Sequence, residues 1–235
     1  MAQKKLLRFA QISEFANVFE YPEGMQGKWQ EHFGNNHPMI LELACGRGEY
    51  TVGMAQLHAD KNFVGIDLKG NRIYIGAQHA LKNNIANAAF VRTQIERLPD
   101  YFTAGEVDEI WITFPDPQLR VSKAKKRLTH PRFLRLYQQV LKTNGAIHLK
   151  TDSPQLYDFT KKIIKMYGLH IQEKNADVYS AAIVSDELKI KTHYEGLDIA
   201  GSKKIHYLKF TLPDVIPDLD SRLKDELKQE KPVQP

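Results

Sequence analysis

The chain has 235 residues and is 42% hydrophobic, which is enough for one α/β domain with a sizeable core. It contains no apolar run of the roughly eighteen or more residues that a membrane-spanning helix needs. The first residues, Met1 to Lys5, lack the apolar segment of a secretory signal, so no export is expected. Cys45 is the only cysteine, which rules out an internal disulfide and favours a reducing, cytoplasmic compartment.

The positive charge is concentrated in one segment. The formal net charge is +5, from 33 basic and 28 acidic residues. Between Gln118 and Arg135 there are seven Lys or Arg and no Asp or Glu, so this segment alone carries +7. A local surplus of this kind is typical of a docking surface for a polyanion. A solvated basic loop is the alternative interpretation.

Strand and helix patterns alternate along most of the chain. Residues 1–36 are expected to form a partly flexible arm with a helix near 12–19, and residues 214–235 a charged tail. The domain between them, residues 37–213, begins its regular pattern at Pro38. Strands are predicted at 39–43, 63–67, 88–92, 107–114, 146–150 and 205–212, and helices at 49–57, 71–82, 131–141 and 154–167.

This alternation predicts a doubly wound α/β fold, with a mostly parallel sheet and helices on both faces. Ligands of such sheets bind beyond the carboxyl ends of the strands. Four acidic residues lie at or just beyond the carboxyl ends of predicted strands and should therefore gather along one edge: Glu42, Asp67, Asp116 and Asp152.

The turn after the first predicted strand has the pattern Gly46-x-Gly48 and leads into a helix, as in loops that cradle a phosphate or a nucleoside. The dinucleotide fingerprint needs a third small residue where Thr51 stands, which disfavours NAD. Asp67 ends the next strand, where a carboxylate can bind both ribose hydroxyls. Glu42 adds a second acid, which suits a cationic sulfonium better than a pyrophosphate. A tight turn without a ligand is the alternative.

The segment Phe114-Pro115-Asp116-Pro117 follows the strand-like run 110–113. The two prolines restrict the backbone on both sides of Asp116 and should hold this carboxylate at the strand end. Many methyltransferases that act on nucleobase amines have Asn or Asp followed by Pro-Pro at this place. The segment therefore indicates a methyl-transfer site over the Gly46-x-Gly48 turn, which is called the donor loop below.

In combination, these motifs resemble the bacterial tRNA (guanine-N7)-methyltransferases, which modify a guanine of the tRNA variable loop. The resemblance extends over roughly residues 39–210. It is carried by the segments 41–48 (LELACGRG), 65–67 (GID), 114–117 (FPDP) with the basic run to Arg127, 150–152 (KTD) and 192–195 (THYE).

The resemblance implies a class I Rossmann-like fold, S-adenosylmethionine as methyl donor and tRNA as substrate. The donor contacts it implies, together with the loop glycines, are Glu42, Gly46, Gly48, Asp67, Gln94 and Asp116, with Asp116 also catalytic. The implied guanine-site residues are Arg120, Asp152, Thr192, His193, Tyr194 and Glu195. The implied RNA-phosphate contacts are Lys123, Lys125, Lys126 and Arg127. The chain departs from the family pattern at Ala44, Gln94, Gln118 and Arg120.

Guanine N7 carries an unprotonated lone pair, so attack on a sulfonium methyl needs no general base, only alignment. The methylated base is cationic, and a nearby carboxylate would stabilise the developing charge. A carboxylate also accepts hydrogen bonds from guanine N1–H and N2–H. Asp116 and Asp152 are the candidates. Alternatively, Asp152 caps the helix at Pro154, and Thr192 and Glu195 form a capping box.

No metal is expected, because the nine histidines are scattered and no cysteine pair exists. A monomer or a homodimer fits equally well. Three other functions compete with tRNA methylation: methyl transfer to another base or a small molecule, RNA binding with a degenerate donor site, and NAD-dependent oxidation. The intact glycines and strand-end acids disfavour the second, and Thr51 disfavours the third.

Overall fold

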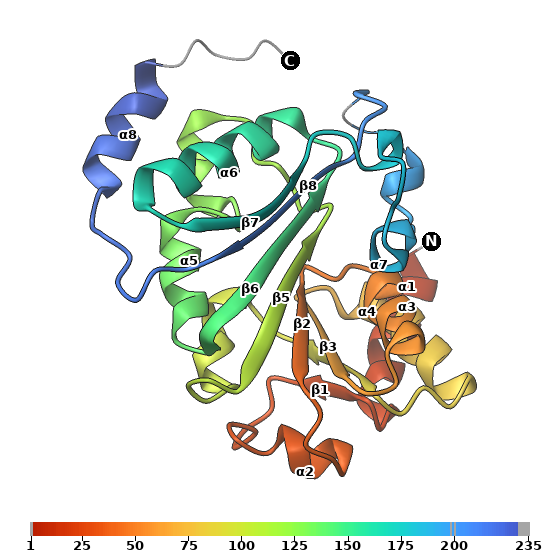
Figure 1. Cartoon of the computed structure of the whole chain (residues 1–235). Coiled ribbons are helices and arrows are strands. Elements are labelled where there is room, and N and C mark those ends of the chain that lie inside the picture. Colours follow the sequence, from red (N-terminus) through yellow and green to blue (C-terminus); the bar gives the residue numbers. More distant parts are fainter. Residues whose placement is uncertain (1, 198, 200, 230–235) are drawn as a thin grey trace.

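The computed structural model describes residues 2–197, 199 and 201–229. These form a sheet of eight strands in the order β1-β4-β3-β2-β5-β6-β8-β7 (Figure 1). Neighbouring strands are parallel from β1 to β6, whereas β8 is antiparallel to both β6 and β7. The strands are β1 (Val18–Glu20), β2 (Met39–Leu43), β3 (Asn62–Asp67), β4 (Ala88–Arg92), β5 (Val107–Thr113), β6 (Leu141–Thr151), β7 (His170–Asn175) and β8 (His206–Thr211).

Helices cover both faces of the sheet, which confirms the predicted α/β architecture. Figure 1 shows α1, α3 and α4 on one side and α5 and α6 on the other. The helices are α1 (Ala2–Gln11), α2 (Trp29–Phe33), α3 (Glu49–Leu57), α4 (Gly70–Lys82), α5 (Pro131–Gln138), α6 (Pro154–Tyr167), α7 (Asp186–Lys189) and α8 (Asp220–Gln229). None of the helices in the described ranges is long and apolar enough to span a bilayer.

Two apolar cores lie against the two faces of the sheet. On one face, the predicted inner side of α4 is confirmed, since Ile73, Ala77 and Ala80 are all buried. On the other face, α5 and α6 bury residues such as Leu134 and Ile163. Burial on both faces explains why the central strands read as continuous apolar runs.

The N-terminal segment differs from the expected arm. In place of the helix predicted near 12–19, α1 ends at Gln11 and is followed by a 3-10 turn (Ile12–Glu14) and the strand β1, which pairs with β4 through Val18 and Phe90. Trp29 is fully buried and stacks on Phe102 with ring centroids 5.2 Å apart. The first 36 residues therefore contribute a strand and a core residue to the same body.

The boundary between α5 and β6 also differs from the prediction. The helix ends at Gln138, and β6 begins at Leu141. Asn144, which we expected to end the helix, has a φ of 62° inside β6, where the register against β5 shifts between Val107 and Glu109. The Asn-Gly pair thus marks an irregularity of the strand rather than a helix end.

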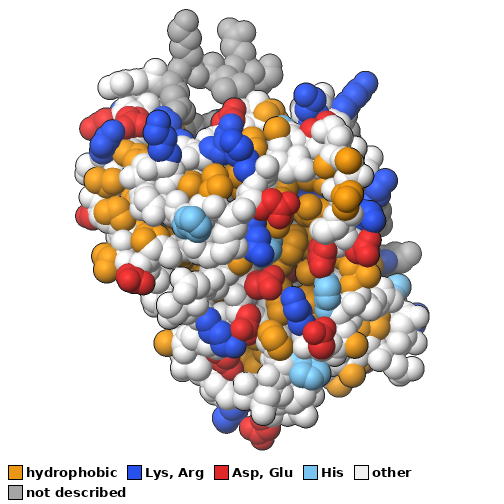
Figure 2. All heavy atoms as spheres, in the orientation of Figure 1, with side chains coloured by type: hydrophobic (Ala, Val, Ile, Leu, Met, Phe, Trp, Pro, Cys, Tyr) orange, Lys and Arg blue, Asp and Glu red, His pale blue; other side chains and the backbone are white. Residues whose placement is uncertain are grey.

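Part of the expected C-terminal tail, Asp220–Gln229, packs as α8, and residues 230–235 lie outside the described residues (grey in Figure 2). Leu223 and Leu227 of α8 are buried in the larger core. Asp220 binds Arg135 of α5 at 2.9 Å and accepts a hydrogen bond from Tyr167. An apolar face and a partly buried ion pair therefore fix α8 onto the helical layer formed by α5 and α6.

Candidate active site

Glu42 is the penultimate residue of the central strand β2, and its carboxylate is buried. It accepts hydrogen bonds from the Thr51 amide (2.8 Å), the Thr51 hydroxyl and the Thr113 hydroxyl (2.6 Å). Burial nevertheless raises the pKa of Glu42 to about 7, because loss of water outweighs these bonds. A carboxylate has about four acceptor sites, so about one stays open to a ligand. Thr51, which departs from the dinucleotide pattern, is thus an anchor for Glu42.

The loop after β2 is built from left-handed residues. Ala44, Gly46 and Gly48 have φ values of 57°, 57° and 71°. At Gly48 a side chain is also excluded by space, because a Cβ would lie 2.4 Å from the Phe90 ring. Ala44 carries a Cβ in a conformation that favours glycine, so this departure from the family pattern stores some strain. The tight loop presents its backbone to any ligand at the strand end.

Asp67 connects this loop to the end of β3. One carboxylate oxygen accepts the Gly46 amide at 3.0 Å, and the other accepts the Lys69 amide at 2.8 Å. Asp67 and Gln94 both line a cavity of about 220 Å³, whose apolar walls include Leu128 and Phe133. The structure therefore brings these two predicted donor contacts together, in a slot with an acid and an apolar wall that suits a nucleoside.

The Phe-Pro-Asp-Pro segment leaves β5 beside the end of β6. The Phe114 amide donates to the Lys150 carbonyl at 2.8 Å, and Phe114 has a φ of 46°. Asp116 is exposed, and its carboxylate accepts the Gln118 amide at 3.0 Å. The backbone of the segment is thus anchored to the sheet, while the carboxylate remains open to solvent and to a ligand.

Arg127 has a different role from the one predicted. It is buried, and its guanidinium donates to the Gln118 carbonyl (3.1 Å) and to the Leu119 carbonyl (3.3 Å). Its Cζ lies 4.4 Å from the centroid of the Phe159 ring on α6. A side chain held in this way is not available to an RNA phosphate. The prediction of an RNA contact is therefore corrected, and Arg127 positions the loop after Asp116.

Four other cations of the segment are accessible. Lys123, Lys125 and Lys126 are exposed on the 3-10 turn η3 (Val121–Lys126). Arg120 precedes this turn and is also exposed. The structure therefore leaves three lysines and one arginine free to face a polyanion just beyond Asp116.

The 192–195 segment folds over the donor loop. A Cβ on Gly46 would lie 3.4 Å from the Tyr194 ring, and the His193 amide donates to the Glu49 carboxylate at 3.3 Å. The Thr192 hydroxyl accepts the Glu195 amide at 3.2 Å, which is one half of a capping box. The Glu195 carboxylate is instead bound elsewhere, so the capping alternative explains only Thr192.

Lys150 and Glu195 form a buried ion pair that sequence reasoning missed. The ammonium lies 2.9 Å from the Glu195 carboxylate and 2.9 Å from the Ile190 carbonyl, and its side chain is 0% exposed. The Tyr179 hydroxyl donates to the same carboxylate. Burial lowers the pKa of Lys150, and Glu195 opposes this shift. The pair fixes Glu195 to the end of β6. The one sequence feature that pointed to a role for Lys150 is its place in the KTD motif.

Asp152 follows the same strand end. The N-cap of α6 is Ser153, whose hydroxyl accepts the Leu156 amide at 3.2 Å, so the alternative that Asp152 caps this helix is wrong. The Asp152 carbonyl accepts a hydrogen bond from Ser202. Since Thr113 pairs with Lys150, Asp116 and Asp152 emerge from adjacent strand ends.

Together, the glycine loop after β2, the acids at the ends of β2 and β3 and the sheet order define a Rossmann-like fold of the class I methyltransferase type. A family model described as "Putative methyltransferase" matches residues 36–207. Among solved structures, the 16S rRNA methyltransferase KamB superposes with a TM-score of 0.60 at 14% identity, over 82% of this chain and 96% of that one. The 30S ribosomal A1408 methyltransferase from an uncultured bacterium (UncKam) gives 0.57 at 20% identity, over 77% and 90%. These two similarities concern the fold alone.

Sequence relatives narrow the class. The chain is 46% identical to the tRNA (guanine-N(7)-)-methyltransferase of Bacteroides thetaiotaomicron, over 91% of this chain and 87% of the relative. It is also 46% identical to that of Porphyromonas gingivalis, over 91% of both chains, and 36% identical to that of Enterococcus faecalis, over 76% and 82%. The chain belongs to the tRNA (guanine-N(7)-)-methyltransferase family. This membership sets aside the oxidoreductase interpretation.

Proposed function

We propose that this chain transfers a methyl group from S-adenosylmethionine to N7 of a guanine in the variable loop of tRNA, at position 46. The observation that carries the proposal is the close approach of Tyr194 to Gly46, where an added Cβ would lie 3.4 Å from the Tyr194 ring. It sets the segment expected to bind guanine directly against the loop expected to bind the donor. A reducing, cytoplasmic setting fits the single buried thiol of Cys45.

The site fits the donor in three respects. The slot at Asp67 and Gln94 would hold the adenosine, with the Asp67 carboxylate toward the ribose hydroxyls. The Gly46–Gly48 turn leaves room for the backbone to approach the ligand. Glu42 would face the cationic amino-acid end. The donor itself supplies a methyl group on a positively charged sulfur.

Protein groups then have only to orient and stabilise. Asp116 and Asp152, which follow adjacent strand ends, would accept hydrogen bonds from the guanine edge and stabilise the cationic product. N7 needs no base to attack, so alignment of N7 with the methyl group provides the rate enhancement. The described residues contain no cluster of three or more His, Cys, Asp or Glu that could hold a metal ion.

A methyl-transfer assay tests the proposal. Labelled S-adenosylmethionine and unmodified tRNA are mixed with the protein, and the product nucleosides are separated. Label is expected in 7-methylguanosine and should disappear when the variable-loop guanine is replaced by adenine. Label in a different nucleoside, or none in RNA despite donor binding, would move the assignment to another methyltransferase substrate.

The pKa of Glu42 makes donor binding depend on pH. Its pKa is about 7 in the fold, against an ordinary value of 4.5 for a glutamate in water, so rising pH ionises the carboxyl of the unfolded chain first. The free energy of unfolding should therefore fall as the pH rises from 4.5 to 7, by about 3 kcal/mol in total.

A cationic donor favours the ionised carboxylate of Glu42, so donor affinity should rise about tenfold between pH 5.5 and 7. Calorimetric titration of wild type and Glu42→Gln checks this: the variant should show no such rise, and an equal rise in both would contradict the role of Glu42.

Charge reversal on η3 should weaken tRNA binding selectively. We expect Lys125→Glu with Lys126→Glu to raise the Kd for tRNA by tenfold or more at low salt, and by less at high salt, because phosphate contacts release counterions. The Kd for the donor should change by less than about twofold, since both side chains lie outside the donor slot. The control is Lys82→Glu with Lys142→Glu, at the opposite edge of the sheet. Equal losses for donor and tRNA would indicate a structural defect instead.

A further inference from the structure

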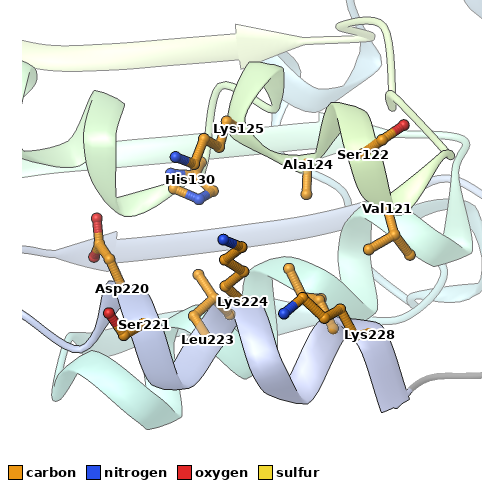
Figure 3. Close-up of a pocket in the computed structure, with 11 residues that line it drawn as sticks. Val121, Ser122, Ala124, Lys125, His130, Asp220, Ser221, Leu223, Lys224 and Lys228 are labelled. Atoms are coloured by element: carbon orange, nitrogen blue, oxygen red, sulfur yellow. The ribbon is translucent and has the colours of Figure 1, made fainter.

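A second cavity lies between η3 and α8 (Figure 3), and it shares no lining residue with the donor slot. Its volume is about 540 Å³, within the usual range of about 300–1,000 Å³ for small-ligand pockets. The floor is apolar and is formed by the buried side chains of Ala124, Leu223 and Leu227. The exposed Val121 forms part of the wall. Of its lining residues, the proposed function uses only Lys125, as a contact to an RNA phosphate.

The rim of the cavity is cationic. Lys125 comes from η3, and Lys224 and Lys228 come from α8, and all three are exposed. In Figure 3 the Lys224 ammonium points from α8 into the space toward η3. Lys228 forms an exposed pair with Asp225 at 3.1 Å, which is a weak and easily exchanged interaction.

The remaining titratable groups of the cavity do not cancel this charge. Asp220 is held by the Arg135 guanidinium at 2.9 Å and by the Tyr167 hydroxyl at 2.9 Å. His130 is buried, and burial lowers its pKa to about 4, so the ring is neutral near pH 7. The cavity therefore combines an apolar floor with three lysine ammonium groups.

A flat apolar group that carries a negative charge fits this combination. A nucleobase can lie against the aliphatic floor and the lysine stems, while its phosphate meets the ammonium groups. The cavity is also close to the target site along the chain. Val121 is five residues after Asp116, so their Cα atoms are at most about 18 Å apart. An RNA strand with its guanine at Asp116 passes within reach.

We propose that the cavity between η3 and α8 binds a nucleotide of the tRNA other than the target guanine, with its base in the cavity and its phosphate among Lys125, Lys224 and Lys228. The proposal rests on the proposed function for the identity of the RNA. It gives α8 a part in substrate binding, although this helix lies outside the residues that the family model matches.

The lysines are tested by Lys224→Met with Lys228→Met. We expect the Kd for unmodified tRNA to rise about tenfold in filter binding, and the slope of log K against log salt to lose about 1.4, or about 0.7 for each lost contact. The Kd for the donor should not change. The matched control is Lys82→Met with Lys142→Met, in which Lys142 is ion-paired with Asp108 as Lys228 is with Asp225.

The base is tested separately by Val121→Trp, which fills the cavity from its exposed wall without changing charge. We expect the Kd for tRNA to rise about fivefold while the salt slope stays as in wild type. Wild-type binding in the lysine variant, or in Val121→Trp, would overturn the proposal. Failure of the proposed function would be seen in a different measurement. The wild-type protein would then form no 7-methylguanosine, regardless of how tightly the variants bind tRNA.

Discussion

Replacing Asp116 with alanine is expected to lower the methyl-transfer rate by at least about 10²–10³-fold, the usual loss when one preorganised electrostatic partner of the transition state is removed. The fold should persist, because the Asp116 carboxylate is exposed and its hydrogen bond to the protein is the one that it accepts from the Gln118 amide. Losing one such bond costs about 1 kcal/mol. Single-turnover rates at saturating tRNA and donor, with thermal melting of the same samples, measure both effects.

Two variants sharpen this test. Asp116→Asn keeps the shape and an acceptor oxygen for Gln118 but loses the charge, so it should share most of the rate loss if charge stabilisation matters. Asp60→Ala removes an exposed acid at the opposite edge of the sheet and should leave the rate unchanged. A rate for Asp116→Ala within about threefold of wild type would remove Asp116 from the catalytic role.

The central fold was predictable because its signals are local. Residues 39–43 are apolar except for Glu42 and are followed by a glycine turn. Such a pattern indicates a buried parallel strand. The edge strands carry no such signal. Residues 170–175 of β7 are largely exposed and polar, and β1 has three residues, so pairing alone defines them. Tertiary contacts decide elements of this kind.

The candidate site divides in the same way. The position of the acids followed from topology, because parallel strands end at one edge, and the structure places Glu42 and Asp67 there. The role of Arg127 did not follow, since nothing near it in sequence reveals that Phe159 and two loop carbonyls surround it. A basic run predicts charge, whereas burial depends on contacts between distant segments.

Lys150→Met is expected to damage both stability and activity. The side chain is fully buried, and its ammonium is bound to Glu195 and lies 5.5 Å from the centroid of the Phe114 ring. Removing it leaves a buried carboxylate without its cation, which costs about 3–5 kcal/mol. Glu195 keeps the Tyr179 hydroxyl but loses its cation, so it should shift from its place beside the donor loop. A displacement of about 1 Å can cost 10²-fold in rate. We therefore expect kcat/KM for tRNA to fall about 10²-fold, with the KM for the donor little changed.

A double-mutant cycle separates the two effects. Lys150→Met combined with Glu195→Gln leaves no unpaired charge, so most of the lost stability should return. Activity should not return, because Lys150 acts through the carboxylate of Glu195. The double variant should then be about as slow as Glu195→Gln alone, which is strongly non-additive behaviour. If the two losses in kcat/KM instead multiply, Lys150 supports the fold alone and the positioning role is wrong. The buried pair thus links the end of β6 to the segment that covers the donor loop, and the cycle measures that link directly.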